Sequence, residues 1–179
     1  MRVASTLAAA STVLIVAAAA PAHASTINGT AGDDTLIGTQ SADVIKALAG
    51  DDSAWGRRGA DEINGGSGDD QLQGMRGPDT LKGGSGSDRL YGQRGTDTLD
   101  DAHGASADFL SGGRGPDQIF ANGEDIVFGN AGDDHIVFVY PATGAKISCG
   151  AGEDTVIFNQ PHSTVALFGC EHVETQSAG

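Results

Sequence analysis

Aliphatic residues recur at a fixed interval along most of the chain, and each follows an aspartate by two residues. The residue between them is mostly polar, so each short segment alternates polar and apolar positions like a β-strand with one inward side chain. The interval is nine residues over the first eight units and changes slightly afterwards. The aliphatic positions are Leu36, Ile45, Ala54, Ile63, Leu72, Leu81, Leu90, Leu99, Leu110, Ile119, Val127, Ile136 and Val156, and the same phase continues through Ile147, Val165 and Val173.

Glycine fills much of the other half of each unit, including the position two residues before the aspartate in all units but two. Because glycine tolerates positive φ, this half predicts a tight turn. One short strand buries little alone, so the units must stack. Two nine-residue units make an 18-residue coil with a strand on each side and a turn at each edge. The sequence therefore predicts an all-β fold, a right-handed parallel β-roll of about eight coils, whose hand follows the general crossover rule.

The best-formed units identify a known repeat. They read GGSGDDQLQ at Gly65–Gln73, GGSGSDRLY at Gly83–Tyr91 and GGRGPDQIF at Gly112–Phe120. This pattern resembles the nonapeptide G-G-x-G-x-D-x-U-x of RTX, or haemolysin-type, calcium-binding repeats. The resemblance covers nearly all of the chain after residue 24, and it implies an RTX-type β-solenoid that binds calcium.

The phase also stacks the aspartates along two edges of the roll. Two carboxylates about 5 Å apart repel by roughly 3 kcal/mol at an effective dielectric of about 20, whereas a divalent ion between them reverses the sign. Calcium, with its loose shell of oxygen ligands, suits such turns better than magnesium. We therefore expect several Ca²⁺ ions that drive folding. The predicted ligands are Asp34, Asp52, Asp70, Asp88, Asp108 and Asp125 on one edge, and Asp43, Asp61, Asp79, Asp97, Asp117, Asp134 and Asp154 on the other.

The formal net charge of -14 argues against nucleic acid or an anionic membrane as a partner. Basic residues nevertheless show an 18-residue period of their own, because Arg58, Arg76, Arg94 and Arg114 each precede an aspartate of the second edge by three residues. One interpretation is charge balance along an edge that is dense in carboxylates. The other is an arginine ladder that binds an anionic cell-wall or extracellular polymer, such as a wall glycan or teichoic acid.

The first 24 residues have the features of a secretory signal peptide. A basic Arg2 precedes an apolar stretch from Thr12 to Ala20, and Ala22-His23-Ala24 matches an A-x-A cleavage site. We expect cleavage between Ala24 and Ser25 and a secreted, extracellular protein. The apolar stretch is too short for a transmembrane segment.

The predicted organisation is a signal peptide at 1–24, calcium-binding repeats at 25–139, and degenerate repeats with a C-terminal cap at 140–179. The chain has two cysteines, Cys149 and Cys170. An even number in an oxidising compartment favours a disulfide that staples the cap, and the alternative is two separate buried thiols.

The sequence has no nucleophile elbow, no H-E-x-x-H helix and no phosphate-binding loop. We therefore expect a secreted calcium-binding repeat protein without catalytic residues. One alternative is a calcium-dependent adhesion or wall-polymer-binding module, which is compatible with calcium binding. Another is a pectate-lyase-like β-helix enzyme, although an 18-residue coil has a narrow interior and leaves no cleft.

Overall fold

The computed structural model describes residues 13–16, 23–102, 106–140, 143–159 and 164–176. These residues form two parallel nine-stranded sheets and no helix. The odd-numbered strands make up one sheet, here called the odd sheet, which contains β1 (Val13–Val16), β3 (Asp34–Ile37), β5 (Ser53–Arg58), β7 (Gln71–Arg76), β9 (Arg89–Arg94), β11 (Phe109–Arg114), β13 (Ile126–Ala131), β15 (Thr143–Ala151) and β17 (Thr164–Phe168). The even sheet contains β2 (Thr26–Asn28), β4 (Val44–Ala49), β6 (Glu62–Ser67), β8 (Thr80–Ser85), β10 (Thr98–Asp100), β12 (Gln118–Ala121), β14 (His135–Phe138), β16 (Thr155–Phe158) and β18 (His172–Thr175).

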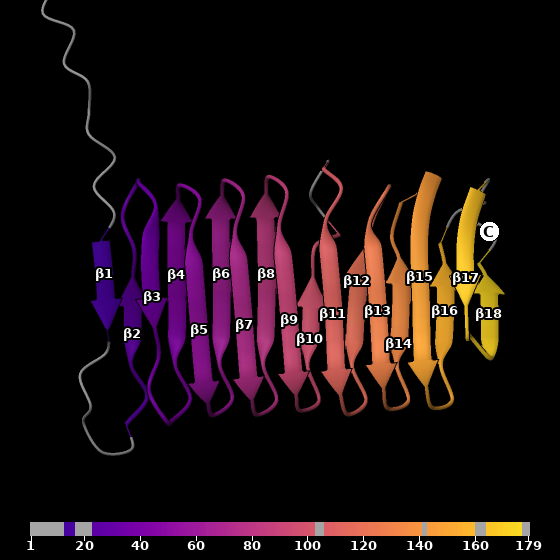
Figure 1. Cartoon of the computed structure of the whole chain (residues 1–179), viewed down its shortest axis with the longest axis horizontal. Coiled ribbons are helices and arrows are strands. Elements are labelled where there is room, and N and C mark those ends of the chain that lie inside the picture. The colour runs from indigo at the N-terminus through magenta and orange to yellow at the C-terminus, as the bar shows by residue number, and fades with distance from the viewer. Residues whose placement is uncertain (1–12, 17–22, 103–105, 141–142, 160–163, 177–179) are drawn as a thin grey trace, which may run out of the picture.

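The chain winds as a solenoid, because each strand pairs in parallel with the strand two places further along (Figure 1). Turns from even to odd strands form the first edge of the solenoid, at the top of Figure 1. Turns from odd to even strands form the second edge, at the bottom. The prediction of an all-β parallel solenoid of about eight turns is confirmed.

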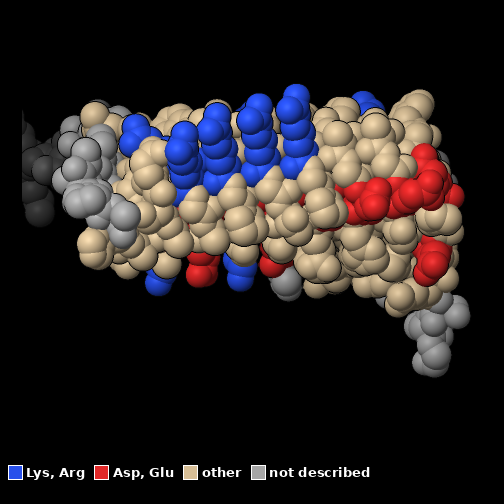
Figure 2. Space-filling view, turned by 90° about the horizontal axis from the view of Figure 1, so that it is seen from below, with Lys and Arg blue, Asp and Glu red and all other residues tan. Residues whose placement is uncertain are grey.

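The two edges carry different side chains at equivalent turn positions. On the second edge the last residue of β5, β7, β9 and β11 is arginine, and parallel pairing places Arg58 opposite Arg76, Arg76 opposite Arg94, and Arg94 opposite Arg114. Seen from this edge, basic side chains form a row of parallel columns, and acidic side chains gather toward the C-terminal end (Figure 2). The predicted 18-residue period therefore becomes a ladder of arginines on adjacent strands.

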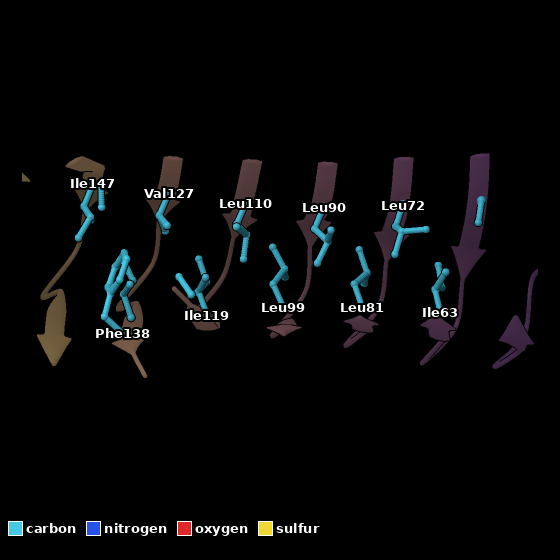
Figure 3. Close-up of a cluster of buried hydrophobic side chains, with 14 of the residues drawn as sticks. Ile63, Leu72, Leu81, Leu90, Leu99, Leu110, Ile119, Val127, Phe138 and Ile147 are labelled. Atoms are coloured by element: carbon cyan, nitrogen blue, oxygen red, sulfur yellow. The ribbon is translucent and has the colours of Figure 1, made fainter. Parts of the chain in front are cut away.

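The core is a double row of aliphatic side chains between the two sheets (Figure 3). Most strands turn an aliphatic side chain inward, as Leu72 of β7 and Leu81 of β8 illustrate, and both of these are fully buried. Toward the C-terminal end Phe138 and Phe158 join the core, with ring centroids 5.4 Å apart. The predicted inward positions from Leu36 to Val156 are all buried, whereas Val173 in the last strand remains 45% exposed.

The inward row changes register in β17, although Val165 still packs, partly buried, against the core. Val165 was expected to continue the aliphatic phase, but β17 pairs with β15 so that Leu167 lies opposite Ile147. The register between these strands shifts between Thr143 and Lys146. This irregularity changes which residue of β17 continues the row, and a fixed nine-residue count from Val156 does not anticipate it.

Both ends of the chain bear on the sequence predictions. Most of the expected signal peptide lies outside the described residues, apart from Val13–Val16, which form β1 beside β3, and residues 23 and 24. Among the described segments, no helix is long and apolar enough to cross a membrane. At the other end Cys149 and Cys170 form the predicted disulfide, with their Cα atoms 5.1 Å apart.

Candidate metal centre

Every turn of the solenoid buries the aspartate that its repeat supplies. Each such aspartate stands at or just before the first residue of a strand, where the chain leaves the glycine-rich turn. All thirteen predicted ligands are at most 2% exposed. A carboxylate withdrawn this far from water requires hydrogen-bond donors or a cation in compensation.

Except in Asp34, whose Oδ2 accepts from the backbone N–H of Thr30 in its own turn, one oxygen of each carboxylate joins the coils into a ladder. On the first edge the backbone N–H of each aspartate donates to Oδ1 of the aspartate one coil further on, at 2.7–3.1 Å, from Asp34 to Asp125. The second edge repeats this arrangement from Asp43 to Asp154, at 2.8–2.9 Å. Beyond Asp154 the ladder continues to Glu171, which replaces aspartate in phase. The two predicted edges are therefore two continuous stacks.

The other carboxylate oxygen has no hydrogen-bond partner among the described residues in eleven of the thirteen aspartates. The exceptions have local donors. Thr39 donates its backbone N–H and its hydroxyl to Asp43, and the backbone N–H of Asn122 donates to Asp125. Buried polar atoms are nearly always paired in proteins, so an unpaired carboxylate oxygen that recurs from turn to turn indicates a position where a cation can bind.

In seven of these aspartates the unpaired Oδ2 lies against the glycine five residues earlier in the same turn. A Cβ added at Gly92 would lie 2.5 Å from Oδ2 of Asp97 and 2.6 Å from the carbonyl oxygen of Gly112 in the next coil. A Cβ at Gly65 would lie 2.7 Å from the carbonyl oxygen of Gly83 and would also collide with Oδ2 of Asp70. Glycine thus keeps open a space lined by a carboxylate oxygen and a carbonyl oxygen from successive turns.

Electrostatics in the ladders disfavours bare carboxylates. Burial, helped by neighbouring aspartates of the ladder and opposed by the backbone hydrogen bond, raises the pKa of Asp70, Asp79 and Asp117 to about 7. The pKa values of Asp61 and Asp97 rise to about 6, again mainly through burial. These groups hold protons, or bind a cation, far more readily than exposed aspartates do.

The arrangement fits calcium. The donors are carboxylate and backbone carbonyl oxygens, which hard cations prefer, and they come from flexible turns that can supply a variable number of ligands. An ion between successive turns would meet the unpaired oxygen of one turn and the carbonyl of the next. The predicted aspartates and the neighbouring turn carbonyls therefore offer the kind of oxygen donors that calcium takes.

Sequence reasoning missed one buried carboxylate, Asp101. It is 2% exposed, and it lies with Asp88 and Asp108 so that one oxygen of each falls within 4.8 Å of the others. Burial, together with the nearby Asp108, raises the pKa of Asp101 well above its ordinary range. Asp101 is outside the nine-residue phase, and the only sequence signal was the Asp100-Asp101 pair just before the spacing changes.

The first edge also carries an outer ladder of exposed carboxylates. The backbone N–H of Asp51 donates to Oδ1 of Asp33 at 3.0 Å, and that of Asp69 donates to Oδ1 of Asp51 at 2.9 Å. These residues directly precede the buried aspartates of the first edge. They give that edge a second row of negative charge.

The arginines of the second edge make no ion pair in the described part of the chain, where His172–Glu153, at 3.5 Å, is the one such pair. Beside the arginine ladder, four residues have φ of 76–84°, namely Arg57, Met75, Gln93 and Asn130. This left-handed backbone conformation costs energy in a residue other than glycine. With the arginines, the first three line an open groove of about 500 Å³ along β5, β7 and β9. A second groove of about 460 Å³ continues to Arg114 and Asn130.

Comparison with known protein families agrees with this geometry. The family model of the RTX calcium-binding nonapeptide repeat matches the chain in four copies, at residues 24–45, 37–72, 64–99 and 104–136. A search of curated proteins found no match, and neither did a search of solved structures. Because the matched repeats span more than half of the chain and build the turns of both aspartate ladders, the chain belongs to the RTX calcium-binding nonapeptide-repeat family.

Proposed function

We propose that this protein is a secreted calcium-binding repeat protein in which Ca²⁺ ions bridge stacked turns and drive folding. Its role is binding, without catalysis of its own. The observation that carries the proposal is the row of buried carboxylate oxygens without partners on both edges of the described solenoid. Seven of these oxygens lie against a turn glycine, beside a space that a calcium ion could occupy.

Calcium supplies the stabilisation that the core lacks. Most coils contribute two inward aliphatic side chains and bury two carboxylates, so apolar burial is small and charge burial is large. Each ion would join two turns and neutralise the carboxylates that otherwise repel along the ladder. The free energy of calcium binding then adds to the free energy of folding, as in other proteins whose metal site exists only in the folded state.

Calorimetric titration of the metal-free protein with calcium tests this function. We expect several ions bound per chain, and weaker binding of magnesium because its strict octahedral shell fits irregular turns poorly. A protein that binds no calcium, or that binds magnesium equally well, would contradict the proposal.

Secretion is part of the same proposal. The backbone N–H of Ser25 lies 2.8 Å from Oδ1 of Asp43, at the start of the second ladder. Cleavage after Ala24 would place the new ammonium group at this carboxylate, which would cap the ladder with a charge-assisted contact. The intact mass of protein collected from the medium should correspond to a chain beginning at Ser25, and an uncleaved mass would count against secretion by this route.

A second candidate function is calcium-dependent binding of an anionic extracellular polymer. The supporting observation is the ladder of Arg58, Arg76, Arg94 and Arg114, whose guanidinium groups are exposed and unpaired. Arginine forks bind carboxylates and phosphates in bidentate fashion. Strained residues that line the same groove are a further sign of a functional surface.

Calcium would make this edge attractive to anions. On the second edge each of these coils adds one ladder carboxylate and one arginine, so an ion between successive turns would leave the edge positively charged. On the first edge Asp33, Asp51 and Asp69 add a second carboxylate, so an ion there would leave the edge close to neutral. The calcium-loaded groove would therefore be positively charged, although the chain as a whole carries a negative net charge.

Binding of a short oligogalacturonate and of a glycerol-phosphate oligomer, with and without calcium, tests this second candidate. The methyl ester of the oligogalacturonate is the neutral control. Arg76→Gln/Arg94→Gln should abolish binding, whereas Lys46→Gln/Lys82→Gln, which removes the same charge from exposed positions of the even sheet, should preserve it. Equal binding by both double variants, or binding that persists in chelator, would reject this candidate.

A further inference from the structure

The regular 18-residue spacing of the first edge is first lost in the turn between β10 and β11. Asp97 and Asp108 are eleven residues apart instead of nine, and the family match is interrupted between residues 99 and 104. Asp101 occupies the place in this turn that Gly83 occupies in the preceding turn of the same edge. It stands seven residues before its ladder aspartate, whereas Gly83 stands five before Asp88. The longer turn places a charged side chain at a position where the preceding turns of this edge have Gly29, Ala47, Gly65 and Gly83.

The Asp101 carboxylate reaches back into the space of the preceding turn. A Cβ added at Gly83 would lie 2.5 Å from Oδ2 of Asp88 and 2.8 Å from Oδ1 of Asp101. At Gly65 and Gly92 the corresponding neighbour from the next coil is a backbone carbonyl oxygen instead. Asp101 therefore puts a carboxylate oxygen where other turns offer a neutral carbonyl.

Three buried carboxylates meet at this point. Oδ1 of Asp101 accepts a hydrogen bond from the backbone N–H of Gly84 at 3.3 Å. The Oδ2 atoms of Asp88, Asp101 and Asp108 have no partner, and each residue is only 2% exposed. Among the described residues this is the one group of three side chains that could hold a metal ion in this way.

The backbone of Asp101 is fixed by its other neighbours. Its N–H donates to the carbonyl oxygen of Phe120 at 3.0 Å, and its own carbonyl accepts from the side-chain amide of Asn122 at 2.6 Å. Asn122 is itself buried. The next coil thus holds Asp101 with its carboxylate directed at Asp88, which is the positioning expected of a ligand.

We propose that Asp88, Asp101 and Asp108 form a three-carboxylate calcium site that is the tightest on the chain and fills first. This inference rests on the calcium binding proposed above. Affinity in oxygen-ligand sites rises with the number of ligand charges and with the rigidity of the site. An ion at this position joins the coils on either side of the break in the repeat, so the irregular turn becomes the most strongly bridged point of the solenoid.

Competition titration against a chromophoric calcium chelator, on the full chain, tests the site. Asp101→Asn keeps the shape of the side chain and removes its charge, and it should weaken the first binding step by roughly tenfold or more while leaving later steps unchanged. Asp100→Asn is the matched control, because it removes the same charge from the adjacent, half-buried residue, and it should titrate like the wild type. Asp101→Gly introduces the residue type that the preceding turn has at Gly83. This variant should therefore fold in excess calcium and lose only the first calcium-binding step.

The outcomes are distinct. An unchanged first step in both Asp101 variants, or an equal loss in Asp100→Asn, would overturn the three-carboxylate site while leaving calcium binding intact. A wild-type chain that binds no calcium would overturn the proposed function and this site together.

Discussion

The backbone N–H of Asp70 donates a hydrogen bond of 2.8 Å to Oδ1 of Asp88, one coil further along the solenoid. Oδ2 of Asp88 is buried and has no partner among the described residues. The contact therefore aligns two acidic side chains of successive coils and leaves a carboxylate oxygen of each free for a cation. This relationship recurs along both edges. The stability of the fold therefore depends on whether a cation lies between successive turns.

Position in the ladder should determine the cost of losing a carboxylate. Asp70 lies between Asp52 and Asp88, each with an unpaired oxygen, so it can serve two ion sites. Asp154 is followed by Glu171, whose side chain is exposed. We expect Asp70→Asn to raise the calcium concentration at the folding midpoint more than Asp154→Asn does, as followed by circular dichroism. Equal midpoints would contradict the stacking of shared sites.

Glycine at the first turn position should be required for ion binding rather than for backbone conformation. Gly92 is not in the left-handed region, so alanine fits its backbone, but the added Cβ would fill the space between Asp97 and Gly112. Gly92→Ala should shift the calcium midpoint strongly upward. Gly123→Ala is the control, since its φ is +41° and nothing lies within 4 Å of the added Cβ. Its cost should be limited to roughly 1–2 kcal/mol of backbone strain. A larger calcium shift for Gly123→Ala would refute the proposed role of the glycine-lined space.

The metal-free protein should be more stable in acid than at neutral pH. The pKa values of Asp70, Asp79 and Asp117 rise to about 7 in the folded chain, mainly through burial, from about 3.9 in an unfolded one. Raised folded pKa values mean that protonation favours folding, so this stability is complete below about pH 4 and is lost as the pH rises toward 7.

Circular dichroism of metal-free protein across this range should show β-structure increasing as the pH falls. Calcium affinity should change in the opposite direction, because protons compete for the same oxygens. Metal-free stability that increases from pH 4 to pH 7 would show that the buried carboxylates are stabilised by some means other than a cation.

The disulfide should stabilise the end of the solenoid where the aspartate phase weakens. Cys149 and Cys170 are 21 residues apart, and closing a loop of that size stabilises by about 3 kcal/mol in the chain-entropy model. Near them Ala145 and Glu171 stand where the ladders would have aspartate. Urea unfolding of Cys149→Ser/Cys170→Ser in saturating calcium should show a loss of this size. An unchanged midpoint would mean that the cysteines do not constrain the unfolded chain.

The sequence period predicted the parallel sheets, the inward aliphatic rows and both aspartate ladders, because each follows from one repeated unit. It failed where the unit changes. Leu167 takes the place opposite Ile147 that was expected for Val165, because the strand register shifts, and Asp101 enters the site because its turn is longer. Neither of these two positions can be predicted from the nine-residue period.

Other features depend on three-dimensional packing that a linear pattern does not contain. Positive φ at Arg57, Met75 and Gln93 follows from their place in the turns, where other repeats have glycine. The contact between Tyr91 and Phe109, with centroids 5.5 Å apart, arises only when adjacent strands of the odd sheet are paired. Tyr91 and Phe109 follow no periodicity that would have identified this contact.

Circular dichroism of the chain from Ser25 onward, in chelator at neutral pH and then in increasing calcium, tests the central claim most directly. In chelator the buried carboxylates have no cation, so the spectrum should be that of a largely disordered chain. Addition of calcium at millimolar or lower concentration should convert it cooperatively to β-structure. A chain that is equally rich in β-structure with and without calcium would contradict the account.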